Sequence, residues 1–405
     1  MKRCFGWCSA GAGAEAGAGA SASASREGGG GSVESRDGLL WHTDLKPHSS
    51  GDFSIAVVQA NDSLEDQGQV LASSSATYFG VFDGHGGPEA SRFVNARLFS
   101  HLHGIDALVL WFDHFFFSVG FITFFFAEFA SEQGGLSVEV IRKAFTATEE
   151  EFLQLVKQSW RSRPKIASAG SCCLVGAIAD NVLYVANLGD SRAVLGRRGA
   201  DGGAVVAERL SRDHNVGEEE VRRELTELHP DDSRIVTYNR GAWRIKGIIQ
   251  VSRSIGDVYL KKPELSGDAL YQKLAAPVPL TRPVVTAEPS IRIRNIKQND
   301  LFLIFASDGL WEHLSDEAAV DIGIAKRLVQ AAVAEAAKKR EMRYDDIKHV
   351  EKGIRRLVHD DITVIVIYLS HGGSDDGEEG EGSKFEGGNV DCTNAPVDVF
   401  SLHAA

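Results

Sequence analysis

Short apolar runs along most of the chain constrain the fold more than any other feature of the sequence. Each run is dominated by Val, Ile, Phe, Tyr or Leu and is bounded by polar residues or Gly, as β-strands are. Because the runs do not alternate regularly with helical segments, antiparallel sheets are favoured over a doubly wound parallel sheet. The runs are FSIAVVQAN (53–61), TYFGVFD (77–83), SCCLVGAIA (171–179), VLYVANLGD (182–190), IIQVS (248–252), LFLIFASD (301–308) and ITVIVIYL (362–369).

Three further segments predict helices outside these sheets. Apolar residues recur at intervals of three and four over 88–102 and 137–158, which places them on one face of a helix. The Ala-rich segment 323–342 predicts a third long helix. Strands outnumber helices, so we expect an α+β fold with antiparallel sheets inside and helices outside.

The chain of 405 residues reads as one large domain between two segments of low complexity. Residues 38–370 contain neither a Pro/Ser-rich linker nor an internal repeat. Residues 1–37 are rich in Ala, Gly and Ser, and residues 371–405 are acidic and Gly-rich. Such segments cannot bury enough apolar surface to offset their ordering entropy, so both are predicted to be disordered.

The charge and the cysteines narrow the class of protein. The formal net charge of −13 argues against nucleic-acid binding, which usually needs a basic face. The spacing of the five cysteines matches neither a zinc site nor a disulfide framework, which favours a reducing compartment. The start, MKRCFGWCSAGAG, lacks the apolar region of a secretory signal. Cys4 and Cys8 could accept palmitate, but two free thiols are the favoured reading.

An Asp stands at the end or the start of several predicted strands, commonly beside Gly. A single Asp-Gly is most often a turn, but the pattern occurs in six places. Carboxylates gathered at one edge of a sheet would repel one another unless a cation lay between them. Oxygen ligands favour Mg²⁺ or Mn²⁺ over zinc. The six segments are LED (64–66), VFDGHGG (81–87), NLGDS (187–191), SIGDV (254–258), FASDGLW (305–311) and HDD (359–361).

The segment DGHGG combines a metal ligand with a proton donor. Asp83 can bind a metal ion, and the carbonyl group of Gly84 can join it. A lone His is usually a hydrogen-bonded surface residue, but His85 lies among glycines next to that Asp. We therefore predict that His85 is a general acid beside the metal centre.

These residues resemble the metal-dependent type 2C protein serine/threonine phosphatases. The likeness extends over 38–370 in order: LED, VFDGHGG, GSCCLVG, ANLGDSRAVLG, SRSIGD, FLIFASDGLWE and HDDITVIVI. The segments GLLWHTDL, VVQANDSLEDQ and LHPDDSRIV are similar to the plant branch called clade D. The resemblance implies a two-layer antiparallel β-sandwich flanked by helices on both faces, which agrees with the strand-rich pattern.

The resemblance also implies a mechanism. Two Mn²⁺ or Mg²⁺ ions, with a third bound more loosely, would activate a bridging hydroxide that attacks the phosphorus in line. His85 would protonate the departing Ser or Thr oxygen without a phosphoenzyme. Motifs of the cysteine, aspartyl and calcineurin-like phosphatases are missing. The implied metal-binding residues are Glu65 (through water), the adjacent Asp66, Asp83, Gly84 through its carbonyl group, Asp190, Asp308 and Asp360.

The sequence departs from the family pattern in four places. Asn61 stands where many relatives carry an Arg that grips the phosphate, and Asp361 stands where many have Asn. The segment YNRGAW (238–243) differs from the Trp-Asn-Gly-Ala-Arg segment of phosphatases inhibited by abscisic-acid receptors, so we do not expect that regulation. Residues 319–328 lack the short Pro-containing loop usual in clade D.

Residues 104–128 (GIDALVLWFDHFFFSVGFITFFFAE) form a Phe-rich insertion in this pattern. These residues are a poor membrane span, because a span needs about 20 consecutive apolar residues and Asp106 and Asp113 interrupt the run. A core helix is disfavoured because the run is apolar all round and lies at an outer connection. The codons of Phe are rich in pyrimidines, and the codons of Ala127 and Glu128 permit the letters CAG. A pyrimidine-rich tract followed by CAG is typical of the end of an intron. Our hypothesis is that 104–128 is a retained intron or a gene-model error, and that the missing loop near Ile322 is a second splicing irregularity. Sequencing of the transcript across both places tests this hypothesis.

We therefore expect a monomeric protein-serine/threonine phosphatase that acts in plant signalling. The resemblance implies phosphoprotein substrates, including the plasma-membrane proton pump, and a cytoplasmic or nuclear location or a peripheral one at the plasma membrane. No nucleic acid and no transmembrane span are expected. The alternatives are a catalytically weak phosphoprotein-binding regulator, suggested by Asn61 and the insertion, and a membrane-tethered regulator anchored by 104–128.

Overall fold

The computed structural model describes residues 40–73, 76–103, 135–199, 202–262, 282–370 and 388–391. The chain divides into two units, Met1–Ser32 and Val33–Ala405. The first unit lies outside the described residues, so the fold given below is that of the second.

One six-stranded sheet, called sheet A here, contains the most apolar strand predicted from the sequence. In strand β16, ITVIVIY, the residues Ile362 to Ile367 are all buried, because this strand is central and is covered on both faces. All neighbouring strands of sheet A are antiparallel, as predicted. Their order is β1 (Leu40–His48), β2 (Gly51–Val58), β16 (Ile362–Tyr368), β15 (Asp300–Ala306), β9 (Arg192–Arg198) and β10 (Val205–Arg209).

The second six-stranded sheet, sheet B, is also antiparallel throughout. Apolar side chains of the two sheets form a shared buried cluster between them. In this cluster the rings of Phe79 from sheet B and Phe305 from sheet A meet edge to face, with centroids 4.8 Å apart. The strand order of sheet B is β14 (Ser290–Asn295), β8 (Val182–Leu188), β7 (Cys173–Ala179), β4 (Ala76–Phe82), β3 (Gln67–Ala72) and β17 (Gly388–Asp391).

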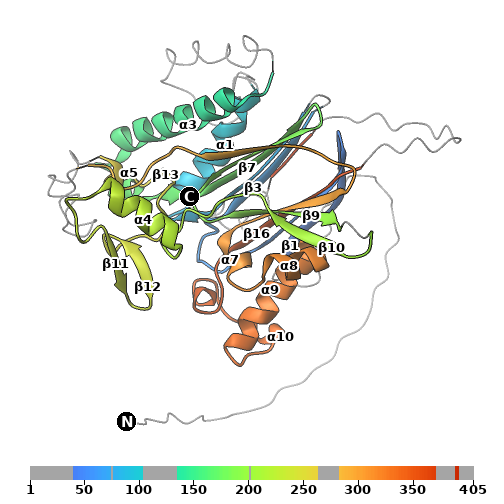
Figure 1. The fold of residues 1–405 in the computed structure, drawn as a ribbon. Helices are drawn as coiled ribbons and strands as arrows, with labels where there is room; N and C mark the ends of the chain where they lie inside the picture. Colours follow the sequence, from blue (N-terminus) through green and yellow to red (C-terminus); the bar gives the residue numbers. More distant parts are fainter. Residues whose placement is uncertain are drawn as a thin grey trace, which may run out of the picture. The chain divides into compact units, whose positions relative to one another are not determined.

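Helices cover the outer face of each sheet (Figure 1). α1 (Glu89–His103) and α3 (Val138–Ser159) pack on sheet B, while α8 (Asp316–Ile322) and α9 (Ala325–Lys339) pack on sheet A. The Ser137 hydroxyl group caps α3 by accepting a hydrogen bond from the Val140 N–H. The predicted two-layer sandwich with helices on both faces is therefore confirmed.

Smaller elements gather beside the edges of the two sheets. A three-stranded sheet joins β13 (Ile255–Gly256), β6 (Gly170–Ser171) and β5 (Gly84–His85). β11 (Val236–Asn239) and β12 (Ala242–Ile245) form a hairpin. The remaining elements are α4 (Glu219–Leu228), α5 (Val258–Lys261), α7 (Asp308–Trp311), α10 (Tyr344–Ile347) and the 3₁₀ turns η1 (Pro164–Ser168) and η3 (Arg355–Leu357).

Two expectations from the sequence differ from the structure. The segment 248–252 is not a strand of a sheet, because it makes only isolated bridges, from Ile249 to Ile245 and from Val251 to Asn215. Its apolar side chains pack against the helices and sheet B instead of a neighbouring strand. Within 371–405, where we expected disorder, β17 pairs with β3. This pairing covers hydrogen-bonding groups that an edge strand would leave exposed.

The Phe-rich segment 104–128 lies outside the described residues, as do residues 1–37 and most of 371–405. The domain boundaries and the intron hypothesis therefore stay predictions. Near Ile322 the chain passes from α8 to α9 through Gly323, whose φ of +59° closes the first helix in the left-handed conformation.

Candidate active site

The strand-end carboxylates converge where one end of sheet A meets one end of sheet B. Sheet A brings Asp308, which follows β15, and Asp360, which precedes β16. Sheet B brings Asp66 before β3, Asp83 after β4 and Asp190 after β8. In an antiparallel pair one strand ends where its neighbour begins, so these positions fall at the same edge.

The carboxylates of this cluster raise one another's pKa. Burial raises the pKa of Asp83 well above its usual value, and the charges of Asp308 and Asp66 raise it further. Burial also raises the pKa of Asp66 and Asp308 well above the usual range, and neighbouring carboxylates add to the effect. Burial raises the pKa of Asp360 to about 6, although Arg356 lowers it. The cluster is therefore electrostatically unfavourable when no cation neutralises it.

Glu65 and Gly84 complete the set predicted from the sequence. Burial raises the pKa of Glu65 to about 7, with further repulsion from Asp361 and Asp360. Gly84 lies so close to the Glu65 segment that a Cβ atom there would collide with the Glu65 carbonyl oxygen and the Ser91 hydroxyl group. Only Gly fits this approach. Hard oxygen donors dominate the cluster, which fits Mg²⁺ or Mn²⁺.

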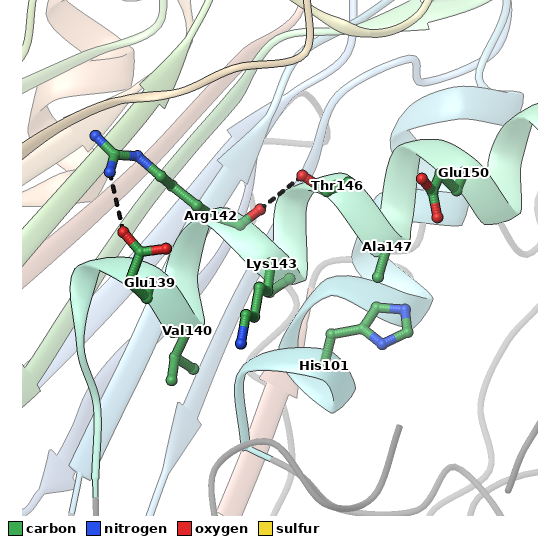
Figure 2. A pocket seen from close by; sticks show the side chains of 9 residues that line it. His101, Glu139, Val140, Arg142, Lys143, Thr146, Ala147 and Glu150 are labelled. Carbon is green, nitrogen blue, oxygen red and sulfur yellow. Dashed lines mark hydrogen bonds and ion pairs between the residues drawn. The ribbon is translucent and has the colours of Figure 1, made fainter. Parts of the chain in front are cut away.

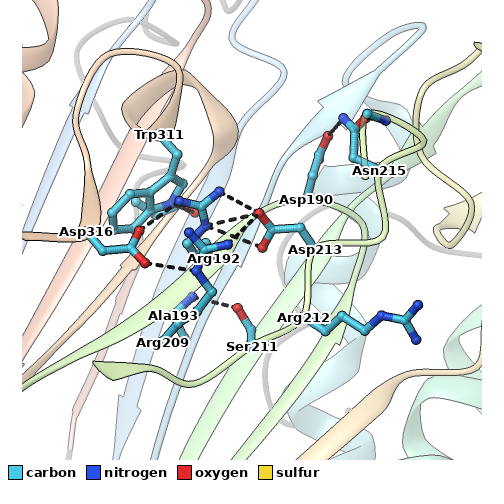
Figure 3. Close-up of polar contacts among 12 residues, drawn as sticks. Asp190, Arg192, Ala193, Arg209, Ser211, Arg212, Asp213, Asn215, Trp311 and Asp316 are labelled. Atoms are coloured by element: carbon cyan, nitrogen blue, oxygen red, sulfur yellow. Dashed lines mark hydrogen bonds and ion pairs between the residues drawn. The ribbon is translucent and has the colours of Figure 1, made fainter. Parts of the chain in front are cut away.

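Asp190 accepts a hydrogen bond on each of its carboxylate oxygens, and Figure 3 shows the contact with Asn215. Cys172 Sγ donates to Asp190 Oδ1 over 3.3 Å, and Asn215 Nδ2 donates to Oδ2 over 2.6 Å. The potential ligand atoms of Asp83, Cys172 and Asp190 lie within 4.8 Å of one another. Burial raises the pKa of Cys172 well above its usual value, so the thiol is a hydrogen-bond donor here. The sequence analysis did not single out Cys172 or Asn215.

His85 faces Asp257, the carboxylate of SIGDV. The distance from His85 Nε2 to Asp257 Oδ2 is 2.7 Å, and the Ser254 hydroxyl group donates to the same oxygen over 2.6 Å. Burial alone lowers the pKa of His85, but the charge of Asp257 and the hydrogen bond to it outweigh this effect and raise the pKa. We had grouped this Asp with the strand-end carboxylates; the structure makes it the partner of the His instead.

A buried ion pair braces the turn that carries Asp257. Lys261 Nζ lies 2.7 Å from Glu149 Oε1 and donates to the Ser254 carbonyl oxygen over 2.8 Å. Glu149 Oε2 accepts a hydrogen bond from the Gly256 N–H over 2.9 Å. Helix α3 therefore holds β13 and α5 in place, and β6 pairs with both β13 and β5, the strand that carries His85. The sequence offers no local signal for this brace, because its partners are far apart in the chain.

Asp361 organises the loop between β2 and β3. Its Oδ1 accepts hydrogen bonds from the N–H groups of Ala60 and Asn61, over 2.6 and 3.0 Å. Its Oδ2 accepts from the Glu65 N–H over 2.8 Å and from Asn61 Nδ2 over 3.2 Å. Four donors suit a carboxylate, which has acceptors only, better than an amide. The two departures from the family pattern at 61 and 361 thus contact each other.

A second polar network lies next to Asp190 (Figure 3). Arg192 pairs with Asp213 over 2.5 Å and with Asp316 over 2.8 Å, and its guanidinium group lies 5.1 Å from the centre of the Trp311 ring. This network ties β9 to the loop before α4 and to α8. The guanidinium group of Arg192 is therefore used for structural contacts.

A pocket lies between α1 and α3 in the outer helical layer (Figure 2). It is lined by His101 of α1 and by residues of α3, including Lys143 and Glu150. None of the site residues predicted from the sequence lines it, so the cluster and not this pocket is the candidate active site.

Comparison with known proteins agrees with this arrangement. The family description "Protein phosphatase 2C" matches residues 53–345, well over half of the chain. The chain belongs to the protein phosphatase 2C family. Its members are metal-dependent protein-serine/threonine phosphatases, so this protein is an enzyme of that class.

Plant proteins are similar to this phosphatase over nearly its whole length. "Probable protein phosphatase 2C 78" of Oryza sativa subsp. japonica is 64% identical over 375 residues, covering 90% of this chain and 88% of that protein. "Probable protein phosphatase 2C 63" of Arabidopsis thaliana is 59% identical over 386 residues, covering 92% and 93%. These likenesses favour the enzyme over the catalytically weak regulator.

A solved structure shares the fold of the phosphatase. The serine-threonine phosphatase 2C from Toxoplasma gondii superposes with a TM-score of 0.51 at 17% identity, covering 82% of this chain and 99% of that one. Within the described ranges, no helix is both long and apolar enough to cross a membrane. The insertion at 104–128 lies outside those ranges.

Proposed function

We propose that the phosphatase hydrolyses phosphoserine and phosphothreonine at the carboxylate cluster. The observation that carries this proposal is the convergence of buried acidic groups from both sheets, each raising the pKa of its neighbours. Two Mn²⁺ or Mg²⁺ ions would relieve this repulsion, with a third, looser ion beside Asp190. The residues proposed to hold them are Glu65, Asp66, Asp83, Gly84, Asp190, Asp308 and Asp360.

The bound cations would supply charge neutralisation at the phosphoryl group and a water molecule of lowered pKa. His85 has the role of the proton donor to the Ser or Thr oxygen that leaves. Because Asp257 occupies Nε2, the nitrogen that delivers the proton is Nδ1. Asp257 also fixes the plane of the ring, which is a positioning role.

The similarity to clade D extends the proposal to the substrate and the location. Phosphorylated plasma-membrane proton pump is the proposed substrate, and the enzyme would reach it as a monomer from the cytoplasm. Release of phosphate from pump-containing membranes by purified enzyme tests this part. Intact pump phosphorylation after incubation with enzyme that is active on a peptide would reject it.

Removing one metal ligand tests the site itself. Asp83→Asn and Asp308→Asn each withdraw a charged ligand from a hard cation, so each should remove most activity on a phosphothreonine peptide with saturating Mn²⁺. A matched control is Asp180→Asn, because Asp180 follows β7 at the opposite end of sheet B and has a φ of +49° that Asn tolerates.

The control should keep full activity, and an excess of chelator should silence the wild-type enzyme. A near-normal rate in Asp83→Asn or Asp308→Asn, with the variant folded by circular dichroism, would contradict the proposed site.

A further inference from the structure

A phosphate group that enters this site would meet the bound cations, and in many relatives an Arg at the position of Asn61 adds a further positive group that grips it. Asn61 cannot supply one. Its side chain is neutral, and its Nδ2 atom donates to Asp361 Oδ2 over 3.2 Å and to Asp360 Oδ1 over 3.4 Å. The amide is thus used to hold the loop between β2 and β3.

Arg356 lies beside the carboxylate cluster, in contact with Asp360. Its Nη2 atom is 2.6 Å from Asp360 Oδ2. Among the ion pairs between described residues, this one alone joins a Lys or an Arg to a carboxylate of the proposed metal set. The Arg356 side chain is 50% exposed, whereas that of Asp360 is 17% exposed. The guanidinium group therefore stands at the solvent boundary of the cluster.

The backbone beneath Arg356 is fixed by its neighbour. Arg355 is buried in the same 3₁₀ turn, η3, and donates from Nε to the Val350 carbonyl oxygen over 2.8 Å. Its Nη1 atom donates to the Gln59 carbonyl oxygen over 3.2 Å. One Arg of the pair anchors the turn to the end of β2, so the other is presented from a fixed position.

Another Arg near the cluster is already paired with carboxylates outside it. Arg192 is only 15% exposed and is held between Asp213 and Asp316. Arg356 uses Nη2 for Asp360, and the rest of its fork of N–H donors can face a ligand. A fork of this kind matches two oxygens of a phosphate group.

We propose that Arg356 binds the phosphate of the substrate and replaces the cation that position 61 lacks. This inference rests on the proposed function, because it places the substrate phosphate at the carboxylate cluster. Arg356 is then a substrate-binding residue for phosphomonoesters, and its ion pair with Asp360 positions the guanidinium group before the substrate binds.

The test uses the full chain loaded with Mn²⁺ and compares Arg356→Ala, Arg356→Lys and Arg343→Ala. Arg343 is the matched control. It is an exposed Arg just before α10, and it pairs with Asp346 within that helix. Competitive inhibition by inorganic phosphate and kcat/KM for a phosphothreonine peptide are measured. Arg356→Ala should raise the inhibition constant and lower kcat/KM, each by about 10- to 100-fold, as expected for charged hydrogen bonds.

Arg356→Lys should lie between the wild type and Arg356→Ala, because Lys keeps the charge and loses the fork. Arg343→Ala should match the wild type. The Mn²⁺ concentration for half-maximal activity should not rise in Arg356→Ala. An increase in that concentration, with an unchanged inhibition constant for phosphate, would mean that Arg356 only positions Asp360 and would overturn the inference.

The two proposals fail in different ways. An inactive Asp308→Asn enzyme together with unchanged phosphate inhibition in Arg356→Ala overturns the inference and leaves the proposed function standing. An active Asp308→Asn enzyme overturns both.

Discussion

At the scale of single residues, the same side chain serves different purposes according to what lies beside it. Asp83 and Asp257 are both Asp residues next to Gly, the first partly exposed and the second fully buried. The first is surrounded by other carboxylates and forms no ion pair with a described residue, which suits a cation. The second meets His85, whose ring it holds. Burial and neighbours, and not residue type, separate a metal ligand from a positioning group.

His85→Gln tests the role of the ring through the leaving group. A Ser or Thr alkoxide is very basic and needs a proton, whereas a nitrophenolate leaves almost unaided. General acid catalysis contributes about 10²–10⁴-fold, so the variant should lose most of that factor on a phosphothreonine peptide and much less on an aryl phosphate. The Mn²⁺ requirement should change little, because His85 has no ligand role.

Steady-state rates on the two substrates decide the matter. Equal losses on peptide and aryl phosphate would show that His85 orients water or a metal ion, and the proton donor would then have to be another group.

At the scale of elements, the position of the turn that carries Asp257, between β13 and α5, depends on contacts with helices and short strands. The three-stranded sheet β13–β6–β5 sets His85 opposite the β13–α5 turn through pairs of only two residues on each strand. Such short ladders are weak by themselves. The Glu149–Lys261 pair adds a contact from α3, and that contact ties the turn to one of the long helices.

Lys261→Met tests this brace. The side chains of Lys261 and Glu149 are 8% and 18% exposed, so the variant leaves a mostly buried carboxylate without its counterion. We expect the free energy of unfolding to fall by about 3 kcal/mol, the low end for a broken buried pair, because Glu149 retains some exposure. Urea denaturation followed by fluorescence gives the value.

Arg142→Met is the control from the same helix. Arg142 pairs with Glu139 on the exposed face of α3, and such surface pairs contribute about 0–1 kcal/mol. Similar losses in the two variants would show that the Lys261 pair contributes no more than a surface contact.

At the scale of the whole molecule, we expect the proposed metal centre to link the activity to the stability of the fold. The pKa of Glu65 is raised from 4.5 to about 7 and that of Asp360 from 3.8 to about 6 by burial. Without metal, the folded protein therefore holds protons that the unfolded chain has released. The stability from these groups is present at low pH and is lost as the pH rises through the folded pKa values.

The melting temperature of the chelated protein should accordingly fall between about pH 4 and pH 7. Mn²⁺ binds the ionised carboxylates of the folded state, so it should raise the melting temperature most at the high end of that range. Calorimetry with and without Mn²⁺ measures both trends. Glu65→Gln removes one of the groups and should flatten the metal-free slope, while a metal-free melting temperature that rises over this range would contradict the account.

The sequence by itself determined most of the strands and the order of the motifs, and it predicted most residues of the candidate site. A strand such as 362–369 is legible because its apolar composition is a local property, and a motif such as DGHGG is read within a few residues. The segment 248–252 shows the limit of that reading, since its composition suits a strand but no neighbouring strand lies beside it. A ladder needs a partner, and a partner is not a local property.

Only the tertiary structure decided which group faces which. Asp257 lies 172 residues from His85, and Asp361 lies 300 residues from Asn61, so each pairing depends on strand order and register. The six Asp-containing segments have similar local sequences. Their own residues therefore could not show which Asp is a candidate metal ligand and which one pairs with His85. The position of Arg356 is of the same kind, because it follows from β16 lying next to β2, which brings the end of the domain against its beginning.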